Sequence, residues 1–413
     1  MSGPRKLEKS AASLKNLTAR YFMDSHKEAK EGKFCVWVAI IVPIELLKGF
    51  DLVVAVPENH AAACAAKGVG SGQAEKAESR GYSMDLCSYA RIDLGTLFAG
   101  GEGSPTMGLP SPDLLISNNN NCSLLAKWFD VVHREEDVPH FVLDVPFCYG
   151  PQKKEDTEYI ISQFRDLITL IEEMTGQTWD EEKTRQAVAY SSEANRHWKR
   201  FMDRADERPA AITAFDSFLH MAPYITSWRG TPELVEHMKL LADETEEYLE
   251  KKEVPVPNER YRLLWDNIAP WHQLRKMSTR LSELSANVIY ATYTNCLGTI
   301  EGGVDQYPYE DADPLRDLAR IQNSSVCPSG LDLRFKAMQE MIERFGIDGV
   351  IFASNMSCKV YSVMQMDLMR KIRERCNVPA VMIDVDHADA RKYSEEKAFL
   401  RIEAMLEEID GRE

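Results

Sequence analysis

At 413 residues the chain is too long for one ordinary hydrophobic core, and its length predicts two or three domains. Its composition, 44% hydrophobic and 28% charged, is typical of a globular protein. The formal net charge of −16 argues against nucleic acid or an anionic membrane as a partner, because neither is attracted to an acidic surface.

The N-terminal 33 residues are polar, without the apolar core of a signal peptide. The longest apolar run, 34–42, covers roughly half of the ~20 residues that a membrane span needs. We therefore expect a cytoplasmic protein. Its nine cysteines are expected as free thiols rather than disulfides, since the cytosol keeps thiols reduced.

In the first third of the chain, apolar runs alternate with helical patterns. Strands are predicted at 34–42, 52–56, 113–117 and 140–145. Helices are predicted between them, at 44–49, 59–81 and 124–134. Such alternation predicts an open parallel sheet with helices on both of its faces.

Residues 154–253 have helical periodicity, after which the strand pattern returns. The later strands are predicted at 262–265, 287–292, 348–353 and 380–383, with a helix at 361–376. The predicted class is α/β: two similar open parallel-sheet domains of the Rossmann or flavodoxin-like type, joined by a helical segment. The predicted limits are 1–150, 151–255 and 256–413.

Three cysteines stand where such a fold places its ligands, beyond the carboxyl ends of strands. Cys122 directly follows the strand 113–117, Cys358 follows 348–353, and Cys87 begins a predicted helix. A thiolate at a helix N-terminus is stabilised by the helix dipole, which favours metal ligation. The chain has no C-x-x-C pair of the kind that structural zinc sites use. Position alone therefore leaves a metal site and ordinary packing both open.

Five segments carry a resemblance that covers nearly the whole chain. They are VPENHAAACAAKG (56–68), GYSMDLCSYARIDLG (81–95), PSPDLLISNNNNCSLLAKWFD (110–130), NMSCKVYSVMQMDLMR (355–370) and VPAVMIDVDHADARKYS (378–394). The sequence resembles the larger subunit of the 2-hydroxyacyl-CoA dehydratases, a family that also contains the core subunits of ATP-dependent benzoyl-CoA reductases.

The resemblance implies that Cys87, Cys122 and Cys358 ligate one 4Fe–4S cluster with an open iron site. It implies that Glu58 is an acid close to the substrate; the alternative is a glutamate that interacts only with the dipole of its helix. The family's reaction is a radical syn-elimination of water from an (R)-2-hydroxyacyl-CoA to a 2-enoyl-CoA, through a ketyl radical started by one ATP-driven electron.

The family pattern also implies partners. They are a smaller homologous subunit and a separate ATP-dependent activator protein with its own cluster, in addition to the acyl-CoA substrate. The chain itself lacks the P-loop pattern G-x-x-x-x-G-K-[ST], consistent with ATP being handled elsewhere.

One departure and three further cysteines keep alternatives open. Ile40 stands where the best-matching dehydratases carry a serine that helps to hold the substrate, which keeps a reductase of the benzoyl-CoA type, or another substrate altogether, as alternatives. Cys148, Cys296 and Cys327 lie near predicted strand ends, and the last two resemble extra ligands of double-cubane relatives, so an eight-iron cluster is the alternative cofactor. A third hypothesis is an accessory electron-transfer subunit without enzymatic activity. The motifs do not identify the acyl group.

The remaining candidates have structural explanations. Cys35, Cys64 and Cys376 lie within predicted elements and are expected to be packing residues. The acidic segment 383–391 looks like a metal site, but its aspartates are expected to cap turns and the following helix.

Overall fold

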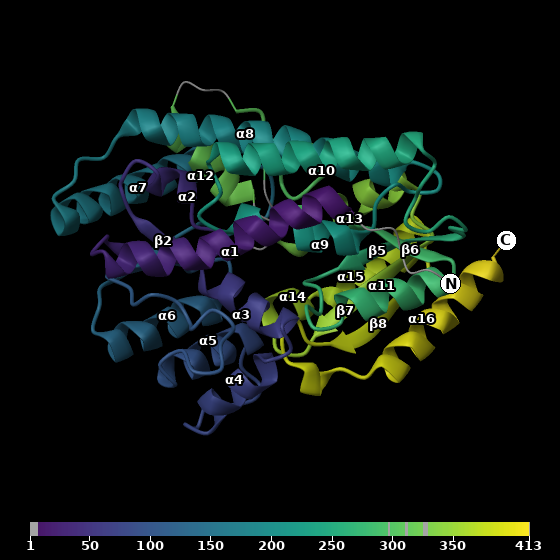
Figure 1. Cartoon of the computed structure of the whole chain (residues 1–413). Coiled ribbons are helices and arrows are strands. Elements are labelled where there is room, and N and C mark those ends of the chain that lie inside the picture. Colours follow the sequence, from purple (N-terminus) through teal and green to yellow (C-terminus); the bar gives the residue numbers. More distant parts are fainter. Residues whose placement is uncertain (1–6, 296–297, 310–312, 325–328, 413) are drawn as a thin grey trace.

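The computed structural model describes residues 7–295, 298–309, 313–324 and 329–412 (Figure 1). It contains two four-stranded sheets in which every paired strand is parallel. The first sheet consists of β1 (Cys35–Val38), β2 (Val53–Ala55), β3 (Leu114–Asn118) and β4 (His140–Leu143). The second consists of β5 (Tyr261–Asp266), β6 (Ala286–Ala291), β7 (Gly349–Asn355) and β8 (Ala380–Val385).

The two sheets have the same topology. Their strand orders are β2-β1-β3-β4 and β6-β5-β7-β8, which become identical when the second sheet is counted from its own first strand. Helical crossovers cover strands such as β1 and β5, and all residues of these two strands are buried. The predicted α/β class with two similar parallel sheets is confirmed.

The first unit contains five helices among the described residues. They are α2 (Ile44–Leu47), α3 (Pro57–Ala66), α4 (Gly70–Glu78), α5 (Ser88–Phe98) and α6 (Ser123–Glu136). The stretch predicted as helical at 59–81 forms two helices, because Gly68 takes a φ of +77° and separates α3 from α4. The strand predicted at 34–42 ends early, since a turn in which Val42 N–H donates to Ala39 O follows β1.

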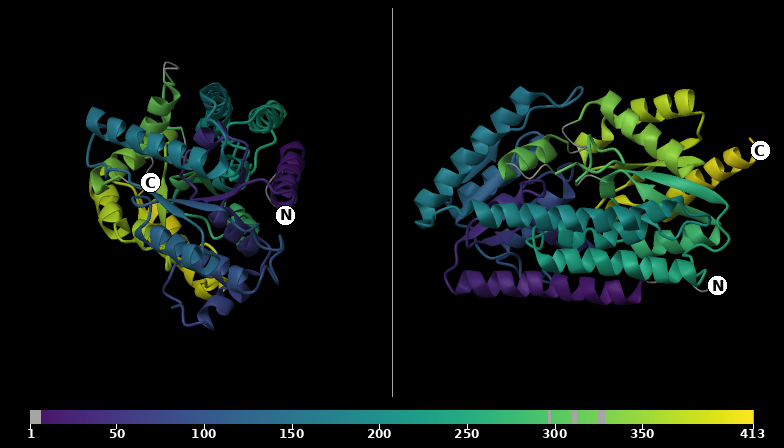
Figure 2. Two further views of the ribbon diagram at one scale, coloured as in Figure 1. Left: turned by 90° about the vertical axis from the view of Figure 1, so that its left-hand side faces the viewer. Right: turned by 90° about the horizontal axis from the view of Figure 1, so that it is seen from above.

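Long helices connect the two sheet units. They are α7 (Lys154–Thr175), α8 (Glu181–Met202) and α10 (Pro232–Glu250), with η1 (Asp203–Asp206), α9 (Ala214–His220) and η2 (Ala222–Ile225) between them. The N-terminal helix α1 (Glu8–Lys30), which the sequence analysis did not anticipate, lies along α10 (Figure 2). Buried Glu244 of α10 accepts hydrogen bonds from Lys9 N–H and Ser10 N–H, both at 2.8 Å, and so holds the beginning of α1.

The second unit contains the remaining helices. They are α11 (Leu274–Glu283), η3 (Tyr293–Asn295), α12 (Pro314–Ser324), α13 (Leu331–Phe345), α14 (Lys359–Ser362), α15 (Gln365–Lys371), η4 (Ile372–Cys376), η5 (Ala390–Lys392) and α16 (Glu395–Asp410). The helix predicted at 361–376 is divided into three, and Ser362 at the end of α14 donates its hydroxyl back to Asn355 O of β7 at 3.0 Å. No helix in the described ranges is long and apolar enough to cross a membrane.

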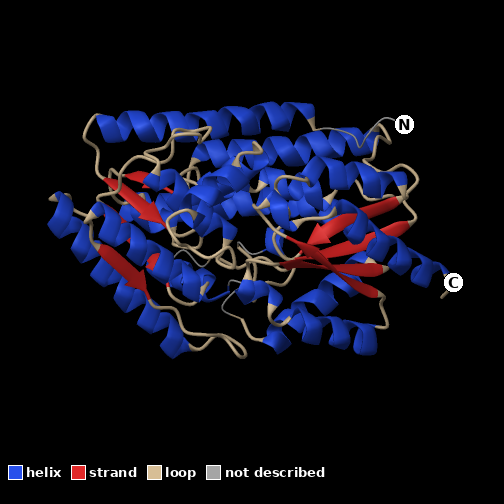
Figure 3. Ribbon diagram, turned by 90° about the horizontal axis from the view of Figure 1, so that it is seen from below, coloured by secondary structure: helices blue, strands red, loops and turns tan. Residues whose placement is uncertain are grey.

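The two sheets lie apart, with loops and helices between them (Figure 3). The predicted limits at 150 and 255 fall between β4 and α7 and between α10 and β5. As division points between domains, they stay predictions. The loops that follow the strands of both sheets meet in the middle, where they line a common cavity.

Candidate functional site

A cavity of about 850 Å³, partly open to solvent, lies between the two sheets. Its lining includes Ile40 after β1, Glu58 after β2, Cys122 after β3, Cys358 after β7 and His387 after β8. These are loops at the carboxyl ends of parallel strands, where open α/β sheets bind ligands.

The cavity brings together the three cysteines that the sequence analysis singled out. Cys87, Cys122 and Cys358 all line it, and none is in a disulfide. Each is the residue that precedes the first turn of a helix, α5, α6 and α14 respectively. Glu58 lines the same cavity, so all four candidate residues share one site.

The protein environment disfavours an uncompensated negative charge on these sulfurs. Burial raises the pKa of Cys87 well above its ordinary value, and the neighbouring thiols Cys358 and Cys122 raise it further when they are ionised. The backbone N–H groups of Tyr89 and Ala90 act in the opposite direction. Burial likewise raises the pKa of Cys122, while the backbone N–H groups of Leu124 and Leu125 act in the opposite direction.

Three thiols of this kind ionise together when a positively charged centre binds them. Within 7–295 and the other described ranges, no three His, Cys, Asp or Glu side chains lie close enough to share a single metal ion. The ligands of an iron–sulfur cluster bind separate irons and stand further apart than ligands of one ion. Cys87, Cys122 and Cys358 supply thiols, the ligand type that holds iron–sulfur clusters, so the chemistry of this donor set fits such a cluster.

Glu58 is the acidic group of the cavity. Its side chain lies in the first turn of α3, is 6% exposed, and accepts a hydrogen bond from Ile40 N–H through Oε1 at 3.1 Å. Its other oxygen, Oε2, has no hydrogen-bond partner among the described residues. Burial raises the pKa of Glu58 to about 7, and the charge of Asp93 adds to the effect. Such a carboxyl can give or take a proton near neutral pH.

Ile40 supplies its backbone to the site and no hydroxyl. Its N–H group holds Glu58, while its side chain contributes to the cavity lining. The serine expected from the dehydratase pattern is thus replaced by an apolar surface at this position.

His387 is a site residue that the sequence analysis missed. Its Nε2 lies 2.9 Å from Ser88 Oγ and 3.6 Å from Cys87 Sγ. The centroids of the His387 and Tyr89 rings are 4.3 Å apart, and the two rings pack edge to face. Burial lowers the pKa of His387 to about 4, so the ring is neutral at pH 7. The only available signal was its place in the segment 378–394, because 300 residues separate it from Cys87.

Comparisons with known proteins show the family of this chain. Residues 39–409 match the family described as 2-hydroxyglutaryl-CoA dehydratase, D-component. The chain belongs to this family. It is 34% identical to the (R)-phenyllactyl-CoA dehydratase alpha subunit of Clostridium sporogenes, over 92% of this chain and 91% of that protein.

Two further relatives extend the comparison within the family. The chain is 30% identical to the (R)-2-hydroxyisocaproyl-CoA dehydratase alpha subunit of Clostridioides difficile, over 97% of this chain and 96% of the relative. It is 26% identical to a subunit of the benzoyl-CoA reductase of Thauera aromatica, over 89% and 87% respectively. The resemblance to this family, expected from the five segments, is confirmed.

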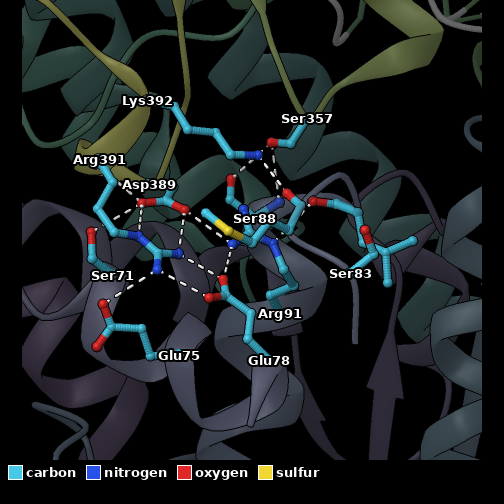
Figure 4. A network of polar contacts seen from close by, with 12 residues as sticks. Ser71, Glu75, Glu78, Ser83, Ser88, Arg91, Ser357, Asp389, Arg391 and Lys392 are labelled. Carbon is cyan, nitrogen blue, oxygen red and sulfur yellow. Dashed lines mark hydrogen bonds and ion pairs between the residues drawn. The ribbon is translucent and has the colours of Figure 1, made fainter. Parts of the chain in front are cut away.

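A polar network joins the two sheet units beside the cavity (Figure 4). Arg91 of α5, fully buried, pairs with Glu78 of α4 at 2.5 Å and with Asp389 of the second unit at 3.0 Å. Arg391 binds the same two carboxylates, at 2.6 Å and 2.7 Å. Because Cys87 and Ser88 lie within one helical turn of Arg91, this pairing fixes the start of α5 relative to the loop after β8.

The acidic segment after β8 has the structural role expected from the sequence. Asp386 accepts hydrogen bonds from the N–H groups of Ala388 and Asp389 and from Ser357 Oγ, at 3.1, 2.9 and 2.6 Å. Asp389 caps η5 by accepting from Arg391 N–H. Asp386 and Asp389 therefore cap turns, as predicted, whereas Asp384, for which capping was also predicted, is an exposed residue within strand β8.

The other cysteines lie elsewhere. Cys148 is buried and donates to Asn323 O at 3.2 Å, outside the cavity lining. Cys35 and Cys64 are packed in the core, and half-buried Cys376 at the end of η4 packs against it, as predicted. Cys296 and Cys327 lie outside the described residues.

Proposed function

We propose that this chain is the alpha subunit of an (R)-2-hydroxyacyl-CoA dehydratase, a hydro-lyase. The observation that carries the proposal is the cavity that collects Cys87, Cys122, Cys358 and Glu58 from both sheet units. Two dehydratase alpha subunits that match at 34% and 30% identity over more than nine tenths of this chain support it.

Cys87, Cys122 and Cys358 would hold one 4Fe–4S cluster with one iron left open for the substrate. When bound, such a cluster would supply the substrate with a low-potential electron. Elimination of water depends on this electron, because the β-hydrogen of the substrate is not acidic and its hydroxyl is a poor leaving group. Their three helix N-termini place positive dipole ends around the thiolates, which lowers the cost of collecting negative charge there.

Glu58 is the proton-transfer residue in this proposal. Ile40 N–H holds Oε1, which leaves Oε2 without a protein partner and available to the substrate. A carboxyl with a pKa near 7 can protonate the departing hydroxyl and later accept the β-proton. The apolar lining around it keeps competing water away from the reacting atoms.

The enzyme would work with two further proteins in the cytoplasm. The matched relatives are named as alpha subunits, which supports a second, smaller subunit. The absence of a P-loop pattern supports a separate ATP-dependent activator with its own cluster.

A reductase is the second candidate function. It is favoured by Ile40, which removes the hydroxyl of the dehydratase pattern, and by the match to a relative from a benzoyl-CoA reductase. An eight-iron double-cubane cluster would require Cys296 and Cys327 as ligands. An accessory electron-transfer subunit, the non-enzymatic alternative, would have no open iron site and would not bind a CoA ester.

The test is the iron and acid-labile sulfide content of anaerobically purified protein, with a Mössbauer spectrum of the same sample. About four irons per chain, one of them spectroscopically distinct, are expected. Cys87→Ser, Cys122→Ser and Cys358→Ser should each lose iron, whereas Cys376→Ser, at a half-buried position outside the cavity, should not. About eight irons would point to the double-cubane reductase.

An absence of iron under these conditions would refute the proposal. The consumption of ATP then separates the two enzymes, because a dehydratase recycles its electron and needs ATP only catalytically. A reductase consumes ATP in every turnover.

A further inference from the structure

Apart from its cysteines, the cavity is lined mainly by apolar side chains. Leu124, Leu125, Trp128, Ile225, Ile268 and Val360 are among them, and they come from both sheet units and from η2. The indole N–H of Trp128 donates to Asp93 at 3.2 Å, so its hydrogen bond is already made. Tyr89 accepts a hydrogen bond from the indole of Trp271. The indole N–H of Trp128 and the hydroxyl of Tyr89 are therefore both hydrogen-bonded to protein groups.

Among the described residues that line the cavity there is no lysine and no arginine. Of the segments that the structure does not describe, 296–297, 310–312 and 325–328 contain neither residue in the sequence, whereas 1–6 contains Arg5 and Lys6. Among the described lining residues, His387 is the one whose side chain could carry a positive charge; its Nε2 lies against Ser88 and Cys87, and its Nδ1 has no protein partner. The described wall of the cavity thus offers no cationic partner for a second carboxylate.

The polar atoms without protein partners suit the head of a 2-hydroxy thioester. Glu58 Oε2 and Asn121 Oδ1 are both buried and unpaired, and both residues line the cavity. A hydroxyl can donate to either of these acceptors. A carboxylate can donate to neither, and it would repel Glu58 when both are ionised.

Glu58 shows that this environment destabilises the charged form of a carboxyl group. Its buried oxygen is unpaired, and burial is the main reason that its pKa is raised. A second carboxylate brought in by a substrate would face the same desolvation, without a compensating cation.

We propose that the cavity selects (R)-2-hydroxyacyl-CoA esters whose acyl side chain is neutral and apolar, branched aliphatic or aromatic, and rejects esters with a second carboxylate. This inference rests on the proposed function and adds the substrate class to it. The aliphatic and aromatic lining gains contact area with each buried carbon of such a side chain.

The test is a substrate comparison on the complex isolated anaerobically through a tag on this chain. Formation of 2-enoyl-CoA is measured with (R)-2-hydroxy-4-methylpentanoyl-CoA, (R)-2-hydroxy-3-phenylpropanoyl-CoA, (R)-2-hydroxyglutaryl-CoA and (R)-lactoyl-CoA. The kcat/KM of the better apolar ester should exceed that of the dicarboxylate by roughly 100-fold. It should exceed that of lactoyl-CoA, which lacks the larger side chain, by about 10-fold or more.

A preference for (R)-2-hydroxyglutaryl-CoA would overturn the inference and leave the proposed function intact. If no ester is dehydrated, equilibrium binding of the unreactive 4-methylpentanoyl-CoA and glutaryl-CoA to the same complex decides. Tighter binding of the apolar ester would support the inference while the dehydratase function fails. Equal binding, tighter binding of glutaryl-CoA, or no binding of either would refute the inference.

A positive charge introduced into the lining tests whether the missing cation causes the rejection of a second carboxylate. Ile41 is half-buried and lines the cavity, so Ile41→Lys can place an ammonium group there. The ratio of kcat/KM for the dicarboxylate to that for the apolar ester should rise by about 10-fold. Ile300→Lys, at a position 40% exposed and outside the lining, is the matched control and should leave the ratio unchanged. An unchanged ratio in both variants would refute the role of the missing cation.

Discussion

Replacing Glu58 with glutamine should make the protein more stable and less active. The carboxyl is 6% exposed, and its pKa is raised from 4.5 to about 7 mainly by burial. A native carboxyl with a raised pKa binds its proton more tightly than the unfolded chain does. The free energy of unfolding therefore falls as the pH rises from 4.5 through 7. At about 1.4 kcal/mol for each pKa unit, the full loss above pH 7 is about 3 kcal/mol.

Glu58→Gln removes this loss, because an amide does not ionise and its oxygen can still accept from Ile40 N–H. The variant should be more stable than wild type, and its advantage at pH 8 should exceed that at pH 6 by about 1 kcal/mol. Its kcat should fall by on the order of 10²- to 10⁴-fold, as expected when a proton-transfer group is lost.

Stability is measured by urea denaturation under argon at both pH values, and activity by dehydration of the preferred ester. Glu182→Gln is the control, since the side chain of Glu182 is 82% exposed and its replacement should change stability equally at pH 6 and pH 8. If Glu58→Gln also shows no pH-dependent difference, the carboxyl is not held in a desolvating environment. If the variant keeps wild-type kcat, Glu58 does not transfer a proton in the reaction.

Two other substitutions test the surroundings of the cavity. Arg91→Met leaves buried Asp389 without one of its partners and should lower the free energy of unfolding by about 3 kcal/mol or more. Arg370→Met breaks an exposed pair and, in the same urea experiment, should lower it by about 0.5 kcal/mol or less. Equal losses in these two variants would contradict a clamp at Arg91. His387→Leu removes the imidazole whose Nε2 lies 3.6 Å from Cys87 Sγ. With Nε2 as donor to that sulfur, the reduction potential of the proposed cluster, followed by EPR-monitored titration, should move to more negative values, while His387→Gln should keep most of the wild-type potential. Identical potentials in all three proteins would show that no such hydrogen bond acts on the cluster.

Much of the fold followed from local patterns. Apolar runs of strand length alternating with helical periodicity located all eight strands of the two sheets, because buried parallel strands must be apolar on both faces. Element boundaries were less accurate. Gly68 divided one predicted helix, and the chain between α14 and α15 divided another, since turns depend on backbone geometry that periodicity does not record.

The sequence also led to the candidate site in part. Cys87, Cys122, Cys358 and Glu58 were identified by family segments and by their position after strands, and they do line one cavity. His387 was missed because nothing in its neighbourhood distinguishes a buried polar histidine from one beside a thiol.

The sequence by itself determined the fold class, the family and the candidate thiols, because these depend on residue type and local spacing. Only the tertiary structure decided which residues surround the thiols. The cavity is formed by two sheets that are far apart in the chain, and the contact between Cys87 and His387 spans 300 residues. The tertiary structure also decided that the pKa of Glu58 is raised and that the described lining lacks a cation. Desolvation and charge pairing depend on every neighbour in space, and the order of residues along the chain does not specify those neighbours.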